Sequence, residues 1–199
     1  MNFLPTIKNG ESVYAGFWKR FCAAFVDAFI ILPLALLFNW LEGFDRGFAI
    51  IITIASSTLF AIYNPYFNVR FGGTPGKLVA GIRITKPDGS KIGWSQAWKR
   101  SSVELVIASI NLIVGVCVLT QLDSASFVSL GWIERGEKVK AHAPSWYTSI
   151  NIFEQVWIWS EIVVVLFNNR KRAIHDFIAG TVVIHKQFAE QQVCHAQAS

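Results

Sequence analysis

The chain has 199 residues, of which 53% are hydrophobic and only 16% are charged, and its formal net charge is +5. A soluble domain usually carries about 25% charged residues, so this composition excludes an ordinary soluble protein and indicates a polytopic membrane protein. The basic residues cluster in a few segments without a nucleic-acid-binding motif, so they indicate membrane topology and no nucleic-acid partner. Three cysteines without paired spacing argue against a disulfide framework or a metal site, and no cofactor is expected.

Four apolar stretches reach the length of a membrane span, which needs about 20 predominantly apolar residues. They lie at about residues 18–40, 47–69, 103–122 and 150–167. The sequence therefore predicts an α-helical membrane protein with about four transmembrane helices. The fourth stretch is the weakest, because Glu154 and Glu161 interrupt it. An interfacial helix with wetted glutamates is the alternative, and it would leave three spans.

The first span contains a charged pair, Arg20 and Asp27, seven residues apart. That spacing puts both on one helix face but about 10 Å apart along the axis, too far for a direct salt bridge. Ala23 and Ala24 line the same face, and small residues let another segment approach closely. We therefore expect this face to point into the bundle, with a partner for Asp27 from another segment or from water. Asp27 is then either a structural contact or a protonatable site in a cation path.

The stretch GGTPGK follows the second span and resembles a phosphate-binding loop. The resemblance fails, because Phe71 stands where the first glycine is required and Leu78 replaces the hydroxyl residue that would bind magnesium. The stretch predicts a tight turn at the membrane surface, whose lysine would contact anionic headgroups. The residues of this turn are Thr74, Pro75, Gly76 and Lys77.

A small β-element is predicted from residues 78–94 together with 181–184. Alternating β-branched residues flank Pro87-Asp88-Gly89, which is typical of a hairpin. Because an isolated hairpin is only marginally stable, residues 181–184 are expected to add a third strand. A helix N-capped by Ser95 would follow the hairpin, and a short helix would end at Gly180. Residues 185–199 form a polar tail.

The distribution of lysine and arginine predicts the orientation. Basic residues cluster before the first span, between the second and third, and after the fourth, which places both termini and the β-element in the cytoplasm. Three spans would put the Arg170-Lys171-Arg172 cluster outside, which the positive-inside rule disfavours. The aromatic residues Trp18, Trp40, Trp98, Trp146 and Tyr147 lie near the proposed span ends, where such rings prefer the headgroup region.

Three stretches carry a resemblance to a known family: GFWKRFCAAFVDAFII, GGTPGKLVAGIRITKPDGSKIGWSQAWKR and RKRAIHDFIAGTVVI. Together they resemble the RDD family of bacterial membrane proteins, over residues 15–184. The family is named for an arginine and two aspartates, which by position correspond to Arg20, Asp27 and Asp176. The resemblance implies a bacterial inner-membrane protein, often of three spans, and some members have been connected to sodium–proton exchange. Residues 123–147 match nothing in this pattern.

The family residues are expected to form one charged cluster of Arg20, Asp27 and Asp176 beneath the turn, closed by the terminal strand. Arg172, four residues before Asp176, is the expected intrahelical partner of that aspartate. His175 and Asp176 are neighbours that do not face each other on a helix, and no nucleophile constellation is present, so no enzyme is expected.

Two functions follow from this sequence. Intramembrane carboxylates are the groups that a path for a proton or a monovalent cation requires, and they favour proton-coupled movement of cations or small solutes. The carboxylates proposed for that path are Asp27, Glu104, Glu154 and Glu161. Four spans form a thin pathway, so transport would favour a homo-oligomer in the lipid bilayer. The alternative is a non-transporting scaffold or accessory protein that acts through its cytoplasmic face.

Overall fold

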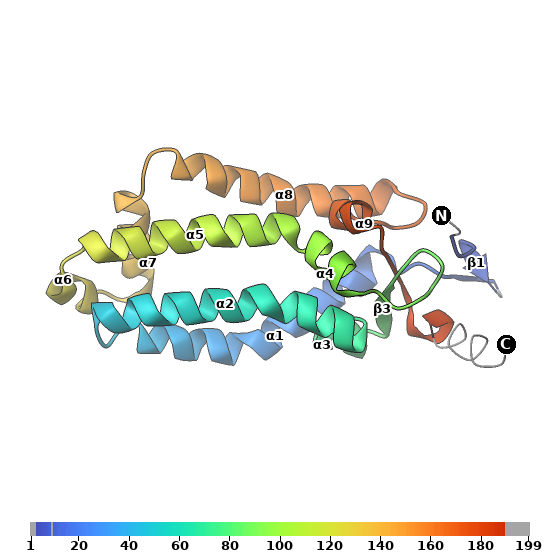
Figure 1. Ribbon diagram of the computed structural model, residues 1–199, viewed down its shortest axis with the longest axis horizontal. Coiled ribbons are helices and arrows are strands. Elements are labelled where there is room, and N and C mark those ends of the chain that lie inside the picture. Colours follow the sequence, from blue (N-terminus) through green and yellow to red (C-terminus); the bar gives the residue numbers. More distant parts are fainter. Residues whose placement is uncertain (1–2, 9, 190–199) are drawn as a thin grey trace. The chain divides into compact units, whose positions relative to one another are not determined.

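A computed structural model describes residues 3–8 and 10–189 (Figure 1). Four long helices dominate it: α1 (Phe17–Leu41), α2 (Arg46–Phe71), α5 (Ser102–Gln121) and α8 (Tyr147–Phe167). Each is long and apolar enough to cross a membrane. The protein is thus an α-helical membrane protein, and the predicted spans agree with the helix bounds to within three residues.

The surface of the long helices explains why the protein needs a bilayer. In α1 the only buried residue is Ala23, while large apolar side chains along the same helix are exposed. Exposed apolar area on this scale is unfavourable in water and is the surface that lipid tails cover. The exposed residues of α1 include Phe21, Phe25, Phe29, Leu32 and Leu36.

The chain packs as two compact units, and each of the four long helices contributes to both. Unit 1 comprises Met1–Ile30, Tyr63–Val103 and Val156–Ser199, and unit 2 comprises Ile31–Ile62 and Glu104–Gln155.

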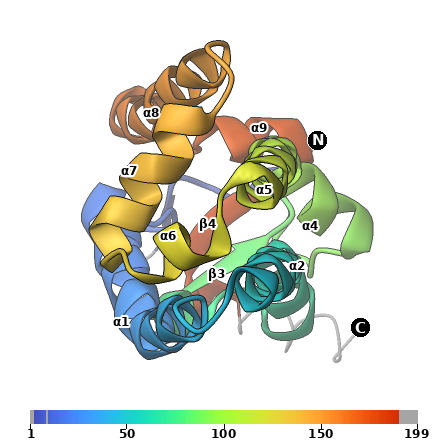
Figure 2. The same cartoon turned by 90° about the vertical axis from the view of Figure 1, so that its left-hand side faces the viewer.

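Unit 1 contains a β-element built from β3 (Ile82–Thr85) and β4 (Val182–His185), which pair antiparallel (Figure 2). Ile82 stands opposite His185 and Thr85 opposite Val182. Tyr14 bridges to Ile184 and adds a third backbone segment beside β4. The alternating apolar residues of β3 belong to a buried core with Val183, Ala15, Ala23 and Ala97.

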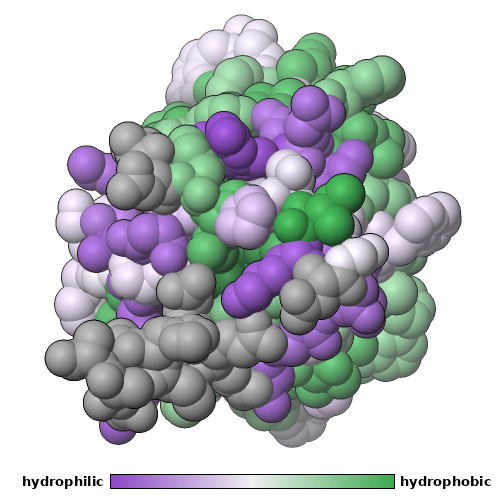
Figure 3. Space-filling view, turned by 90° about the vertical axis from the view of Figure 1, so that its right-hand side faces the viewer, coloured by the Kyte–Doolittle hydropathy of each residue, from purple (hydrophilic) through white to green (hydrophobic). Residues whose placement is uncertain are grey.

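Short helices surround this pair of strands in unit 1. They are α3 (Pro75–Val79), α4 (Trp94–Arg100) and α9 (Ile174–Ala179). Gly180 has a left-handed backbone and ends α9, as predicted from the glycine there. A further pair, β1 (Ile7–Lys8) and β2 (Glu11–Ser12), lies near the N-terminus. Figure 3 faces the side of unit 1 on which β1 lies, at the right of Figure 1, where hydrophilic residues gather among hydrophobic ones.

The predicted hairpin needs correction. Its turn is present, because Lys86 N–H donates to Ser90 O at 2.8 Å and Gly89 has φ of +87°. The second arm, however, is reduced to one bridge between Thr85 and Lys91, and β3 pairs instead with β4.

The two ends of residues 78–94 differ from the prediction as well. Leu78 and Val79 belong to helix α3 rather than to a strand. At the other end, α4 begins at Trp94, so its N-cap is Gly93 and not Ser95. The Gln96 side chain accepts a hydrogen bond from the Gly93 N–H at 3.0 Å, which satisfies the helix end without a serine.

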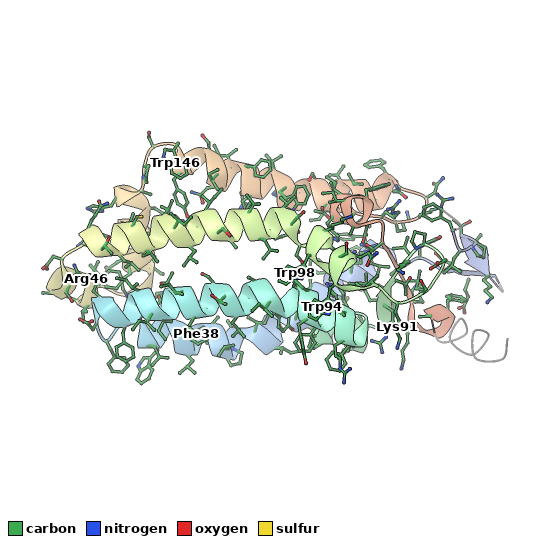
Figure 4. The ribbon with its side chains drawn as sticks, in the orientation of Figure 1. Phe38, Arg46, Lys91, Trp94, Trp98 and Trp146 are labelled. Carbon is green, nitrogen blue, oxygen red and sulfur yellow. The ribbon has the colours of Figure 1, made fainter. Side chains whose placement is uncertain are left out.

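Unit 2 contains two further helices in the stretch that matched no pattern: α6 (Ser124–Val128) and α7 (Trp132–His142), which connect α5 to α8. Its core joins α2, α5 and α6 through Ala49, Val114, Val118, Leu119, Leu122 and Phe127. The guanidinium of Arg46, labelled in Figure 4 at the start of α2, donates to the Leu122 carbonyl at 2.7 Å. This bond satisfies a carbonyl at the end of α5 that has no partner within its own helix.

Candidate functional site

Asp27 on α1 is bound by the segment that begins α3. The Thr74 hydroxyl donates to Oδ2 at 2.5 Å, and the Gly76 N–H donates to Oδ1 at 2.7 Å. The Tyr63 hydroxyl lies farther away, 3.4 Å from Oδ1. Thr74 is the N-cap residue of α3 and Pro75 its first residue, so the carboxylate of Asp27 caps the N-terminus of that helix. The partners of Asp27 are therefore polar groups from other segments.

Gly76 allows this contact because it carries no side chain. A Cβ atom at this position would lie 2.1 Å from the carbonyl oxygen of Ala23 and 2.8 Å from the backbone nitrogen of Asp27. The helix α3 thus packs directly against the backbone of α1, at the small residue Ala23. The stretch predicted as a tight turn is in fact the first turn of this helix.

Lys77 belongs to the charged site rather than to the open surface. It is half-buried, and its ammonium is attracted by Asp27 and Asp176 and repelled by Arg100 and Arg20. Contact between Lys77 and lipid headgroups stays a prediction.

Asp176 on α9 is fully buried, with 0% exposure, and its carboxylate is held from several sides. Arg20 Nη1 lies 2.8 Å from Oδ2, and Arg100 Nη1 forms an ion pair with Oδ1. The Ala173 N–H donates to Oδ2 at 2.9 Å, and the Thr181 hydroxyl lies 3.3 Å from Oδ1. Burial by itself raises the pKa of Asp176, but Arg100 and Arg20 outweigh it and hold that pKa well below its usual value. The carboxylate is therefore ionised at neutral pH.

Arg20 ties this aspartate to α1. Besides Asp176, it donates through Nε to the Ala15 carbonyl at 3.2 Å and through Nη2 to the Lys171 carbonyl at 2.5 Å. Each of these bonds uses a different direction of the guanidinium fork, which fixes the segment before α9 against the start of α1.

The expected pairing of Arg172 with the Asp176 carboxylate is wrong. Arg172 precedes α9 instead of lying within it, and its side chain turns to backbone groups. It donates to the main-chain carbonyl of Asp176 at 2.8 Å and to that of Thr181 at 3.1 Å. Its guanidinium also lies 4.1 Å from the centre of the Phe177 ring.

Arg100 is the residue that sequence reasoning missed. It ends α4, is buried, and also donates to the Thr181 hydroxyl at 2.8 Å. A sequence signal was present, because Arg100 closes the QAWKR end of a stretch that carries the family resemblance. Nothing in the spacing distinguished it from the other basic residues of that link.

His175 connects this site to α8. Its Nδ1 lies 2.6 Å from Oε2 of Glu161, and its backbone N–H donates to Oε1 at 3.0 Å. Its Nε2 lies 2.6 Å from Nη2 of Arg100. Because a guanidinium can only donate, Nε2 accepts, which assigns the proton of the neutral ring to Nδ1. The contact between Nδ1 and Oε2 of Glu161 is close but is not aligned as a hydrogen bond, since Oε2 has no hydrogen-bond partner among the described residues.

The predicted single cluster is therefore two neighbouring sites in unit 1. Asp27 is bound by the start of α3, while Arg20 and Asp176 pair with each other and with Arg100. The other two proposed path carboxylates, Glu104 and Glu154, lie in unit 2. Glu104 is exposed in the first turn of α5, and Glu154 is half-buried and interacts electrostatically with Tyr147. Within residues 3–8 and 10–189, no group of three His, Cys, Asp or Glu side chains could hold a metal ion.

Comparison with known proteins places the chain in a family. The uncharacterized protein YckC of Bacillus subtilis (strain 168) is 24% identical over 180 residues, which cover 90% of this chain and 89% of YckC. The uncharacterized membrane protein YteJ of the same organism is 26% identical over 184 residues, which cover 87% of this chain and 82% of YteJ. No solved structure matches. The RDD family model matches residues 14–180, a range that includes Arg20, Asp27 and Asp176, and the chain therefore belongs to the RDD family.

Proposed function

We propose that this protein moves protons in exchange for a monovalent cation or a small solute, with His175 and Glu161 as the proton-carrying pair. The single observation that carries the proposal is the position of His175, 2.6 Å from a carboxylate on an apolar helix and 2.6 Å from Arg100. Histidine is the side chain that most often shuttles protons in proteins. Ionisable residues on apolar spans are rare and commonly belong to proton relays.

Protonation of His175 changes this network directly. The imidazolium carries a proton on Nε2, so it no longer accepts from Arg100, and the two positive groups repel each other. Its pairing with Glu161 becomes stronger at the same time, because both partners are then charged. Arg100 is left to bind Asp176 and Thr181 alone. The protonation state of one ring thus changes the contact between Arg100 and His175, while the bonds from Arg100 to Asp176 and from the His175 N–H to Glu161 remain.

In this proposal Asp27 is a positioning residue. Its carboxylate already accepts hydrogen bonds from Thr74 and Gly76, so in this proposal it holds α3 in place and does not bind the transported cation. The positive-inside rule supports an inner-membrane protein whose termini and β-element face the cytoplasm. Four helices per chain give a thin pathway, which favours a homo-oligomer. The proposal assigns no catalysed reaction to the chain.

Proton flux in proteoliposomes tests this proposal. Protein reconstituted into vesicles with an internal pH indicator is exposed to gradients of Na⁺, K⁺ or Li⁺. We expect cation-dependent proton movement that His175→Gln reduces at least tenfold. His142→Gln, at an exposed histidine of α7, is the matched control and keeps the flux. Wild-type flux in the His175→Gln variant, or no flux above empty vesicles with the wild type, would overturn the proposal.

A second candidate function is a scaffold or accessory protein without transport. The observation that favours it is that Asp27 and Asp176 are both saturated by protein groups, as structural residues are. If this function is correct, no cation gradient produces proton flux, and the β-element associates stably with another protein. Cation-dependent flux of the wild type above that of empty vesicles would argue against the scaffold.

A further inference from the structure

Unit 1 contains a cavity of about 230 Å³ that is separate from the charged site. It lies between the end of α2 and the β-element. Its lining comes from residues 68–72 at the end of α2, from residues 83–85 of β3, from the turn after β3, and from Ala189. Figure 4 labels Lys91, which belongs to this lining, at the end of the turn. None of Arg20, Asp27 or Asp176 contributes to the cavity.

Three buried polar atoms in this lining have no hydrogen-bond partner among the residues that the structure describes. They are Oδ1 of Asn68, Nη1 of Arg83 and Oγ1 of Thr85. The side chains of Asn68 and Thr85 belong to residues that are only 2% and 4% exposed. Buried polar groups are ordinarily paired, because leaving one unpaired is costly. Each of these atoms has almost no accessible surface as its side chain stands, so a ligand in the cavity would reach it only after that side chain turns. Three residues with such groups line one cavity, which favours a polar ligand.

The positive charge of the lining residues indicates that the ligand carries negative charge. Arg70, Arg83 and Lys91 line the cavity, and among residues 3–8 and 10–189 no aspartate or glutamate belongs to its lining. Asp88 in the adjacent turn is already engaged, because its carboxylate accepts the Ser90 N–H at 2.9 Å. A guanidinium fork and an ammonium together are the groups that proteins use for phosphate.

The uncharged polar side chains of the lining narrow the chemical class of the ligand further. The Thr85 hydroxyl can donate to a phosphate oxygen, whereas the Asn68 side-chain oxygen can only accept. An acceptor beside the cations fits a ligand that carries a hydroxyl next to its phosphate. Two glycines shape the walls: Gly72 has φ of +76° and Gly89 has φ of +87°, values that side chains rarely tolerate. A Cβ at Gly72 would also lie 3.3 Å from Cδ of Arg83.

We propose that this cavity binds a phosphate ester that carries a neighbouring hydroxyl. Arg83, Arg70 and Lys91 neutralise the phosphate, Thr85 donates to it, and Asn68 accepts from the hydroxyl. The ligand is either the headgroup of an anionic glycerophospholipid or a free phosphorylated small molecule. The cavity lies at the end of α2, an apolar helix whose last turn exposes Phe71, and headgroups lie at such helix ends. This inference does not depend on transport.

Thermal unfolding of the full chain in lipid-depleted detergent tests the proposal. The probes are dioctanoyl phosphatidylglycerol, dioctanoyl phosphatidylcholine, glycerol 3-phosphate and inorganic phosphate. We expect a saturable rise in Tm with phosphatidylglycerol or glycerol 3-phosphate and a smaller rise, or none, with phosphatidylcholine. A response to phosphatidylglycerol alone identifies the lipid source, and a response to glycerol 3-phosphate as well identifies the shared phosphate chemistry.

Two variants locate the binding in this cavity. Arg83→Gln is expected to weaken the apparent affinity at least tenfold, and Lys140→Gln removes the same charge from an exposed position of α7 as the matched control. Thr85→Val keeps the shape of the side chain and removes only the hydroxyl. It is the cavity variant to measure if Arg83→Gln does not fold. The proposal is wrong if phosphatidylcholine raises Tm as much as phosphatidylglycerol, if none of the probes raises it, or if the folded cavity variants bind like the wild type.

Discussion

Gly76→Ala is expected to destabilise the protein strongly, although glycine-to-alanine changes inside helices usually stabilise. The new Cβ would lie 2.1 Å from Ala23 O, 2.7 Å from Asp27 Cγ and 2.8 Å from Asp27 N. Two of these neighbours are backbone atoms of α1, so no side-chain rotation relieves the clash. The helix α3 must move away from α1, and the hydrogen bonds from Gly76 and Thr74 to Asp27 are lost with it.

The size of the effect follows from those two bonds. A hydrogen bond to a charged group contributes roughly 1.5–3 kcal/mol, so two contribute about 3–6 kcal/mol. Asp27 is only half-buried, so we take the lower end, about 3 kcal/mol. A change of 1 kcal/mol shifts Tm by roughly 2–4 °C at this chain length, which predicts a fall of about 6–12 °C.

Differential scanning of the purified protein in one detergent measures this shift. Gly136→Ala in α7 is the matched control, because nothing lies within 4 Å of its Cβ position. There the change should be neutral or stabilising by about 0.5–1 kcal/mol, the ordinary gain from replacing a helical glycine. A Gly76→Ala variant with the Tm of the wild type, or a higher one, would refute the close packing of α3 on α1.

Further outcomes follow from the charged residues. Arg20→Ala leaves the buried Asp176 with one arginine fewer, and breaking such a buried pair lowers the free energy of unfolding by about 3 kcal/mol. The Tm of Arg20→Ala should therefore lie below that of Asp27→Asn, and equal Tm values would contradict this ranking. Because the pKa of Asp176 is held below its ordinary value of 3.8, its stabilising effect is complete above that pH and is lost as pH falls toward the lowered pKa. The Tm difference between the wild type and Asp176→Asn should thus not shrink from pH 8 to 5 and should shrink below about pH 4. A difference that already shrinks between pH 7 and 5 would speak against an ionised Asp176. Reporters inserted at Asp88 and fused after Ile184 should both show cytoplasmic behaviour, and opposite sides for the two would remove one span.

The sequence was sufficient to predict the four spans and to predict that Asp27 finds its partner in another segment. Apolar runs of this length have few alternatives to a membrane helix, so the four spans were predicted to within a few residues. The two-turn separation of Arg20 and Asp27 already required a partner for Asp27 from elsewhere, and Thr74 with Gly76 supplies it. Whether two side chains of one helix can touch depends only on their spacing in the sequence, so it can be predicted without knowledge of the fold.

Pairing between distant segments was not predictable in the same way. Arg100 meets Asp176 across 76 residues, and a single sequence does not indicate which of several basic residues will be buried there. The hairpin turn at Gly89 was recognised, but the partner of β3 is decided by burial: Val182, Val183 and Ile184 are apolar and fully buried, whereas Ser90 and Lys91 are polar and exposed. A strand pairs where its apolar side chains can be covered, and that depends on the whole fold.

The spacing of the family residues on α1 now has a physical reason. Asp27 binds the start of α3, and Arg20, two turns earlier, binds the segment around α9 through Asp176 and the Lys171 carbonyl. These two segments flank β3 and β4 in the chain, because α3 leads into β3 and α9 leads into β4. One face of one helix thus fixes the entry of both strands, and Ala23 between the two charged residues allows the approach. A proton-carrying role for Asp27 alone would need neither the second charged residue at this spacing nor the glycine opposite Ala23, whereas anchoring both strands requires all of them.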